Sequence, residues 1–495
     1  MPPTVPVGVS PAGSRATVNA NSFFVVLLQL IQSVLVAATA IYLVQLWRAD
    51  DYGRYVYYIT AASVLPLFAG LGAEHVFLME GSRARSLIPV FFGNALFLRS
   101  ACTLLLSLVA AFVLFFSRAA YAMAVLLIII GALLSVYSNP LFLSLYRVKG
   151  LHVRPWLILF CSPLFFISYL ILLPKAMLSL NAVALGYLLS HLVTLLTFLV
   201  DIRSLVTPQV KWRYIKKFAK TGMVFSASQA FDYGFSRLDI FLIQFVLGPY
   251  AVGLYAAGQK VVSLFQIIPS SFGIVELPEF HRASANQPVL VEKFRRLRRL
   301  LFELSLLFSG LLIVNASDIV GILYPEGYRE SASIVVLLSF ASVLLFVNCP
   351  YYMLAEAINR INERLVARII TFILTGLFML LLLRFRGING AAVGLILGQV
   401  AFIAFLHRLT RDYNSGLHGL LSDGRSFVIG VVGWFAADSL GGLMPHGMFR
   451  ILLTSLIYVM VFVGVGSWLH LNDSIAILKD GVGPVARWWK AKRLE

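Results

Sequence analysis

The chain has 495 residues, of which 60% are hydrophobic and only 13% are charged, and its mean hydropathy is +0.88. Such a composition leaves too little polar surface for a water-soluble protein, so we predict a polytopic membrane protein. The net charge of +18 comes from Lys and Arg residues that are scattered over short connections. Because no domain gathers these cations into one surface, we expect anionic lipid headgroups rather than nucleic acid as their contacts.

The N-terminal half of the sequence predicts one lobe of six spans. Residues 1–21 lack the apolar core of a signal peptide and are predicted to form a cytoplasmic tail. Runs of about 20 apolar residues, the length of a membrane span, then fill residues 22–200. They are Ser22–Leu46, Tyr55–Met79, Leu87–Phe116, Tyr121–Tyr146, Pro155–Pro174 and Met177–Val200. Residues 201–221 form a basic cytoplasmic linker.

A second lobe of six spans is predicted for residues 222–407. Its spans are Gly222–Leu247, Ala251–Gly273, Leu300–Leu323, Ala332–Ala357, Leu365–Leu383 and Ile388–His407. Residues 408–471 add the spans Ser426–Leu440 and Ile451–Leu471, and residues 472–495 form a basic tail. The prediction is therefore an all-α fold of about 14 transmembrane helices. Lys and Arg concentrate in the even-numbered connections and the tails, which predicts that both termini are cytoplasmic.

An internal duplication relates the two lobes. Without a gap, Gln29, Gly53, Tyr55 and Ser63 return two hundred residues later as Gln229, Gly253, Tyr255 and Ser263. Asn139-Pro140 returns as Cys349-Pro350, and Asn181-Ala-Val-Ala-Leu-Gly186 returns as Asn389-Gly-Ala-Ala-Val-Gly394. An ordered series of matches indicates gene duplication, and duplicated lobes are typical of transporters.

Small residues four apart recur in the sixth and twelfth spans of the two lobes. Ala182, Gly186 and Ser190 correspond to Gly390, Gly394 and Gly398. Residues at this spacing share one face of a helix and let a neighbouring helix approach closely. We therefore expect the two spans to pack in equivalent ways.

Charged residues inside a membrane are functional candidates by default. Arg99, Arg237 and Lys260 are candidate lumen cations, and Asp232 and Asp239 lie in the same span as Arg237. At about 1.5 Å of rise per residue, Asp239 and Lys260 share a depth. Two interpretations remain open: a structural Asp239–Lys260 ion pair, or a charged cluster lining a lumen. Arg99 has no acidic partner at its depth in its own lobe, which favours contact with water or an anionic ligand.

Other polar residues in the spans are weaker candidates. Gln29 and Gln32 occupy the repeat positions of Gln229 and Asp232, which favours either a central cavity or hydrogen bonds between helices. His191 corresponds to Gln399, which indicates a polar contact rather than a proton relay. Glu74 falls near the cytoplasmic end of the second span, where it is a candidate for binding a coupling ion or for contacting headgroup water.

The sequence offers no grouping of residues typical of an enzyme, a metal site or a cofactor site. The outward connections are only a few residues long, and the cytoplasmic ones are too short to hold a catalytic domain. Cys102, Cys161 and Cys349 all fall within spans and form no spaced pair, so we expect them to be small packing residues.

Several segments resemble the bacterial polysaccharide and O-antigen repeat-unit flippases of the multidrug, oligosaccharidyl-lipid and polysaccharide exporter superfamily. Asp50-Asp-Tyr-Gly-Arg-Tyr55 and Leu247-Gly-Pro-Tyr-Ala-Val-Gly-Leu-Tyr255 look like the paired signatures that follow the first and seventh spans of that family. Ser236-Arg-Leu-Asp239, Leu323-Tyr-Pro-Glu-Gly-Tyr328 with Ala332, and the block from Asn389 to Gly394 are similar to further family patterns. The resemblance covers essentially the whole chain.

This resemblance implies alternating access between two six-helix lobes in a bacterial inner membrane. The implied cargo is an oligosaccharide on polyprenyl pyrophosphate, moved to the outer leaflet for surface polysaccharide or O-antigen biosynthesis, and the implied partners are a polysaccharide polymerase and chain-length proteins. Arg99, Arg237 and Lys260 would attract the pyrophosphate. Asp232 or Glu74 would bind a coupling proton or sodium ion.

Three alternatives stay open at this stage. A cation-coupled multidrug exporter and a peptidoglycan lipid-precursor flippase belong to the same superfamily. Drug exporters favour acidic, aromatic cavities, whereas this chain places more cations than acids at mid-membrane. A non-transporting membrane scaffold is the third alternative, and in it Arg99 and Arg237 would be buried without benefit unless both were paired.

Overall fold

The computed structural model describes residues 11–117, 121–151, 153–413, 417–442 and 446–465. These residues form helices and connections and contain no β-strand. The predicted tail at 472–495 and the end of the fourteenth span lie outside these residues. Of the predicted tail at 1–21, residues 11–21 are described, and they are helical and continuous with the first span.

The first lobe follows the predicted order of spans. Its elements are α1 (Pro11–Leu46), α2 (Ala49–Ala62), α3 (Leu65–Ala69), α4 (Ala73–Arg83), η1 (Arg85–Leu87), α5 (Ile88–Ser117), α6 (Ala122–Val136), η2 (Tyr137–Phe142), α7 (Leu143–Lys149), α8 (Arg154–Leu159), α9 (Cys161–Leu172), η3 (Lys175–Met177) and α10 (Leu180–Ile202). Three predicted spans are thus broken rather than continuous: α2–α4, α6–α7 and α8–α9.

The second lobe and the final pair of helices complete the all-α fold. They are α11 (Trp212–Leu247), α12 (Pro249–Ser263), α13 (Ile267–Ala283), α14 (Gln287–Leu323), η4 (Glu326–Tyr328), α15 (Ser331–Ala357), α16 (Ile361–Arg386), α17 (Ile388–Leu409), η5 (Arg411–Tyr413), α18 (Leu417–Gly441), α19 (Met448–Val459) and η6 (Met460–Val465). Within the described ranges, 8 helical stretches are long and apolar enough to cross a membrane, and one of them, Arg154–Leu172, joins α8 and α9. The others combine into the remaining predicted spans, which confirms the plan of six, six and two.

The duplication is visible in the helix breaks and in the helix packing. α2 ends at Ala62, before Ser63, and α12 ends at Ser263, so the second span of each lobe breaks at the repeated serine. The Ser63 and Ser263 hydroxyls each donate to a carbonyl one turn earlier. α10 packs against α6 and α9 in the first lobe, and α17 packs against α15 and α16 in the second.

The repeated small residues provide the close helix packing that the sequence predicts. A Cβ at Gly186 would overlap the ring of Tyr169 on α9, and a Cβ at Gly394 would lie 2.7 Å from the backbone nitrogen of Met379 on α16. The expectation that the sixth and twelfth spans dock equivalently is confirmed.

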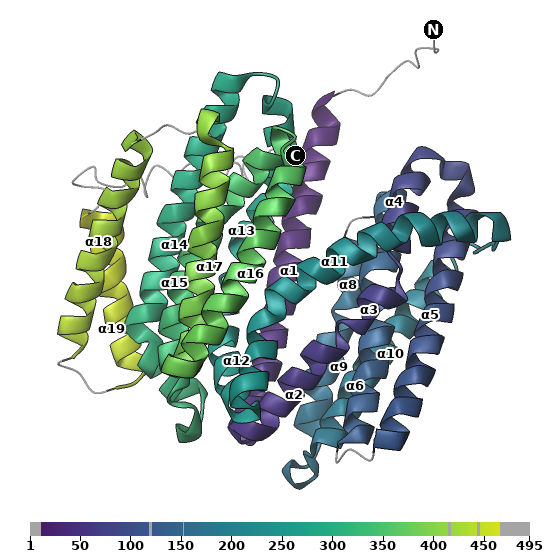
Figure 1. The fold of residues 1–495 in the computed structure, drawn as a ribbon, viewed down its shortest axis with the longest axis horizontal. Helices are drawn as coiled ribbons and strands as arrows, with labels where there is room; N and C mark the ends of the chain where they lie inside the picture. The colour runs from purple at the N-terminus through teal and green to yellow at the C-terminus, as the bar shows by residue number, and fades with distance from the viewer. Residues whose placement is uncertain (1–10, 118–120, 152, 414–416, 443–445, 466–495) are drawn as a thin grey trace.

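The two lobes meet where α2 packs against α12, a contact that we call the junction (Figure 1). One apolar cluster runs through it, with Tyr52 and Tyr255 almost fully buried. Two hydrogen bonds join the lobes nearby, from the Tyr328 hydroxyl to the Trp47 carbonyl (3.1 Å) and from Gln45 Nε2 to the Leu323 carbonyl (3.2 Å). We call this end of the molecule the junction end, and the opposite end, where residues 203–211 connect the lobes, the linker end.

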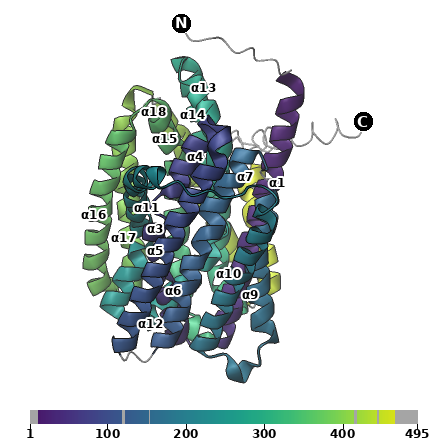
Figure 2. The same ribbon diagram turned by 90° about the vertical axis from the view of Figure 1, so that its right-hand side faces the viewer.

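Two long helices, α1 and α11, contact both halves of the molecule. α1 packs against α8 and α9 of the first lobe and against α12 and α13 of the second, and α11 packs against α4 and α5 as well as α16 and α17. Figure 1 shows α11 running obliquely from the first lobe toward the second. In Figure 2, the first part of α11 is seen nearly end-on while α5, α6 and α10 run vertically, so it lies across the direction of the spans.

Candidate functional site

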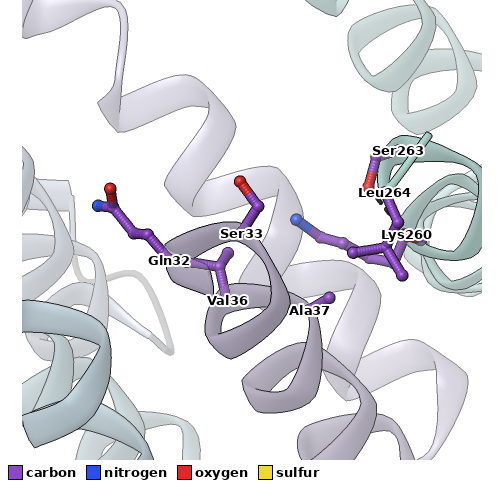
Figure 3. Close-up of a pocket in the computed structure, with 7 residues that line it drawn as sticks. All are labelled: Gln32, Ser33, Val36, Ala37, Lys260, Ser263 and Leu264. Carbon is purple, nitrogen blue, oxygen red and sulfur yellow. Dashed lines mark hydrogen bonds between the residues drawn. The ribbon is translucent and has the colours of Figure 1, made fainter. Parts of the chain in front are cut away.

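A pocket of about 280 Å³ lies between α1, the first span of the first lobe, and α12, in the second span of the second lobe. Lys260 is the charged residue in its lining (Figure 3). The other lining residues are Gln32, Ser33, Val36, Ala37, Ser263 and Leu264. In Figure 3 the ammonium end of Lys260 extends toward α1 beside Ser33, whereas the amide of Gln32 points the other way. The pocket thus presents one cation among hydroxyl and apolar groups.

Among the described residues Asp239 forms no ion pair with Lys260, so the first of the two interpretations, a structural ion pair, is wrong. The Asp239 carboxylate instead accepts hydrogen bonds from the Tyr255 hydroxyl (2.9 Å), Gln259 Nε2 (3.1 Å) and the Ile240 backbone N–H (2.8 Å). The carboxylate is satisfied by these donors and is only 5% exposed. Gln259, rather than Lys260, lies on the side of α12 that meets Asp239. The Lys260 ammonium is therefore left to the pocket.

Arg237 adds a second positive charge near Lys260. Arg237 lies two residues before Asp239 on α11, and its charge acts on both Asp239 and Lys260. Two cations that repel one another inside a membrane protein favour the binding of an anion between or beside them. Of the predicted candidates, the structure places Lys260 in the pocket lining on α12, and Arg237 and Asp239 on α11, which packs against α12.

Arg99 lies elsewhere, inside the first lobe, and the expectation that it has no acidic partner is wrong. Arg99 Nη2 lies 2.7 Å from Glu74 Oε2, and the side chains are 1% and 5% exposed. The pair meets because α3 ends at Ala69 and the chain turns through Leu71 and Gly72, both at positive φ, before α4 begins. Glu74 is therefore buried in the lobe and does not reach headgroup water.

Gly70 makes room for this ion pair. A Cβ at Gly70 would overlap the Arg99 guanidinium and would lie 3.2 Å from Glu74 Oε2. A buried Arg and Glu that face each other compensate for lost hydration only when their geometry is close. The break in the second span is thus what allows the pair to form.

The remaining candidates are dispersed. Gln29 is half-buried on α1, one turn before the pocket. His191 packs its ring edge-on against Tyr187, with centroids 4.6 Å apart, while its repeat counterpart Gln399 accepts a hydrogen bond of 2.6 Å from Asn348 Nδ2. Within the described residues, Gln399 thus makes the polar contact, whereas His191 makes an aromatic one. The Asp232 side chain lies outside the described part of the structure.

Sequence reasoning missed some residues that shape the site. Ser33 lines the pocket and Gln259 holds Asp239, yet neither belongs to a charged group or a repeated motif. A signal was present for Ser33, because residues 29, 32, 33 and 36 share one face of α1. The described residues contain no cluster of three His, Cys, Asp or Glu side chains able to hold a metal ion.

The comparison with protein families assigns the chain. A profile described as "Polysaccharide biosynthesis protein" matches residues 42–333, which is more than half of the sequence. The chain belongs to this family. The predicted resemblance to polysaccharide flippases is thereby confirmed at the level of the family. A comparison with curated protein sequences finds no match.

Solved structures of related folds include a lipid II flippase, MurJ, in an inward closed conformation. It has a TM-score of 0.75 and 13% identity, over 91% of this chain and 98% of that chain. An inward-facing multidrug resistance MATE family transporter of the MOP superfamily has a TM-score of 0.65 and 16% identity, over 77% of this chain and 94% of that chain. The Vibrio cholerae MATE transporter VcmN has a TM-score of 0.55 and 15% identity, over 79% of this chain and 95% of that chain. At these identities the likeness shows the fold.

Proposed function

We propose that this member of the polysaccharide biosynthesis family is a flippase that moves an oligosaccharide repeat unit on polyprenyl pyrophosphate from the cytoplasmic to the outer leaflet of a bacterial inner membrane. The observation that carries the proposal is the pocket between α1 and α12, in which Lys260 is the charged lining residue. A diphosphate is the part of such a cargo that a cation inside the membrane recognises.

In this proposal the linker end faces the cytoplasm and the junction end faces outward. The basic residues Lys211 and Lys216 in the linker region and Arg295 and Arg299 near the start of α14 support this orientation, because cytoplasmic connections are rich in Lys and Arg. The packing of α2 on α12 then closes the outer side while cargo enters from within. The two lobes then rotate relative to one another, with α1 and α11 keeping contact with both. This rotation opens the junction and exposes the pocket to the outer leaflet.

Lys260 and Arg237 hold the pyrophosphate in this scheme, and the sugars occupy the space between the lobes. Ser33 offers its hydroxyl group to the phosphate oxygens from the α1 side of the pocket. The Ser263 hydroxyl lines the other side, where it donates to the Lys260 carbonyl. Arg99 does not bind the pyrophosphate in this scheme, because its charge is already neutralised by Glu74. A coupling proton or sodium ion would act at Glu74 by competing with Arg99 for the carboxylate, and Asp232 is the second candidate for that ion.

The test is a flipping assay in proteoliposomes that contain the purified chain and a lipid-linked repeat unit. Transferred sugar is measured by its oxidation with membrane-impermeant periodate. We expect Lys260→Gln to slow transfer by on the order of a hundredfold, since a charge-assisted contact to phosphate is lost, and Lys260→Arg to retain most of it. Lys175→Gln, which removes an exposed cation at the junction end, is the matched control.

Three results would overturn the proposal. No protein-dependent transfer of any lipid-linked repeat unit would exclude flipping. Export of cationic drugs by the same vesicles would favour the multidrug transporter. Transfer of a peptidoglycan precursor in preference to a polysaccharide repeat unit would identify that precursor as the substrate.

A further inference from the structure

The start of α11 carries a row of positive charge that the transport site does not use. Arg213, Lys216 and Lys220 follow one another at spacings of three and four residues, so they share one face of the helix. All three are exposed. Residues 202–231 contain no Asp or Glu that would neutralise the row from within the segment.

The opposite face of the same turns is fixed to the first lobe. The rings of Tyr214 and Phe218 pack against Phe91 of α5, at centroid distances of 5.5 and 6.0 Å, and Phe218 is fully buried. Further along, a Cβ at Gly222 would overlap the Leu71 carbonyl. This face anchors the helix, so the charged face has a defined direction.

The linker before α11 is anchored as well. The Gln209 N–H donates to the Pro89 carbonyl (3.0 Å), and the Lys211 N–H donates to Asn94 Oδ1 (3.3 Å). The basic row is therefore presented by a docked helix rather than by a loose loop.

An exposed aromatic residue accompanies the charges. Trp212 is 73% exposed and packs against Phe97, with ring centroids 5.4 Å apart. Phe97 lies on α5, one of the apolar spans. Trp residues of this kind sit at the level of lipid headgroups, where the ring contacts acyl chains and the indole N–H contacts water. This part of α11 lies across the spans (Figure 2), which is the orientation of a helix that runs along a membrane surface.

We infer that the first turns of α11 form a binding surface for anionic phospholipid headgroups, made by Arg213, Lys216 and Lys220 with Trp212 as the aromatic anchor. Charge complementarity selects the lipid, and the apolar contact of Trp212 sets the depth of the helix. The same helix continues into the second lobe and packs against α12, α16 and α17. Lipid bound here thus holds the first-lobe end of the helix that connects the lobes.

The experiment uses the full chain in nanodiscs and measures quenching of Trp212 fluorescence by brominated phosphatidylglycerol and by brominated phosphatidylcholine. The chain has 7 Trp residues, so the Trp212 signal is the difference between wild type and Trp212→Phe. We expect stronger quenching by the anionic lipid, with a preference that falls on the order of tenfold in Arg213→Gln/Lys216→Gln/Lys220→Gln, since each cation adds to the attraction. High salt reduces the same preference.

Two variants control for charge and for folding. Lys175→Gln/Arg384→Gln/Arg386→Gln removes three exposed cations at the other end of the molecule and leaves the preference unchanged. Lys216→Arg/Lys220→Arg preserves the positive charge, so we expect it to retain the preference for the anionic lipid. Equal quenching by the two lipids, or an unchanged preference in the neutralised variant, would overturn the inference. Capture of an acidic protein instead of lipid would overturn it too. The measurement needs no cargo, so it is independent of the flipping assay.

Discussion

Gly53 and Gly253, which occupy equivalent positions in the two repeats, cross in direct backbone contact at the junction. A Cβ at Gly53 would overlap the Pro249 carbonyl oxygen, and a Cβ at Gly253 would overlap the Ala49 carbonyl oxygen. Each glycine lets one helix approach the start of the other, so the contact is reciprocal. The junction can close in this way only while both residues lack a side chain.

The first prediction concerns this closure. Gly253→Val is expected to hold the lobes apart at the junction end, because the new side chain cannot share space with the Ala49 carbonyl. Flipping activity should fall on the order of a hundredfold or more, as for a step that needs an exact fit. Labelling of an introduced cysteine at Ser263 by an impermeant outer reagent should rise in the same variant.

A matched substitution tests the interpretation. A Cβ added at Gly321, near the end of α14, would meet only open space, so Gly321→Val should transport like wild type. Normal transport by Gly253→Val would contradict the assignment of the junction as a closing contact.

The second prediction concerns the buried Arg99–Glu74 pair. Arg99→Leu leaves the Glu74 carboxylate in an apolar lobe without this partner and should lower the free energy of unfolding by about 3–5 kcal/mol. The double variant Arg99→Leu/Glu74→Leu should recover most of that loss. Thermal unfolding in detergent measures both. Equal stability of wild type and the single variant would show that the pair is unimportant for folding.

Transport by the stable double variant separates structural from functional roles of the pair. If Glu74 binds the coupling ion, the double variant folds but no longer responds to an imposed proton or sodium gradient. A full response would assign the pair to structure alone and leave Asp232 as the coupling candidate.

The third prediction concerns the attachment of the last two helices. Arg450 Nε lies 3.4 Å from Asp318 Oδ2 on α14, His446 Nδ1 lies 2.7 Å from Asp318 Oδ1, and the Thr454 hydroxyl donates to Asn315 Oδ1 at 2.6 Å. Because Asp318 is almost fully buried, Arg450→Ala should destabilise the docking of α19 by about 1–3 kcal/mol. Faster proteolysis within the connection between α18 and α19, with the two lobes intact, is the expected readout. Arg329→Ala, in an exposed pair with Glu326, should have no effect.

The fold was predictable because its signals repeat. Three features occur in both lobes: apolar runs of membrane length, the matched residues Ser63 and Ser263, and the small residues at Gly186 and Gly394. A prediction made for one lobe is therefore supported by the same pattern in the other. The broken second span was not predictable, because hydropathy does not report the positive φ of Leu71 that separates α3 from α4.

The candidate site was only partly predictable, for reasons of helix rotation rather than depth. Counting residues placed Asp239 and Lys260 at one level, but Tyr255 and Gln259 face Asp239 and take its hydrogen bonds. Counting also kept Glu74 away from Arg99, since it assumed a straight helix from Tyr55. Pairing inside a bundle depends on which face each helix turns inward, and neither hydropathy nor counting residues along a span reports that rotation.

The most direct test of the central claim is to delete the gene in the organism that encodes it and measure polyprenyl-linked repeat units and surface polysaccharide together. The account predicts that lipid-linked units accumulate while surface glycan disappears, and that the wild-type gene restores both, whereas Lys260→Gln and Arg237→Ala do not. Unchanged surface glycan in the deletion strain, with altered sensitivity to cationic drugs, would contradict it.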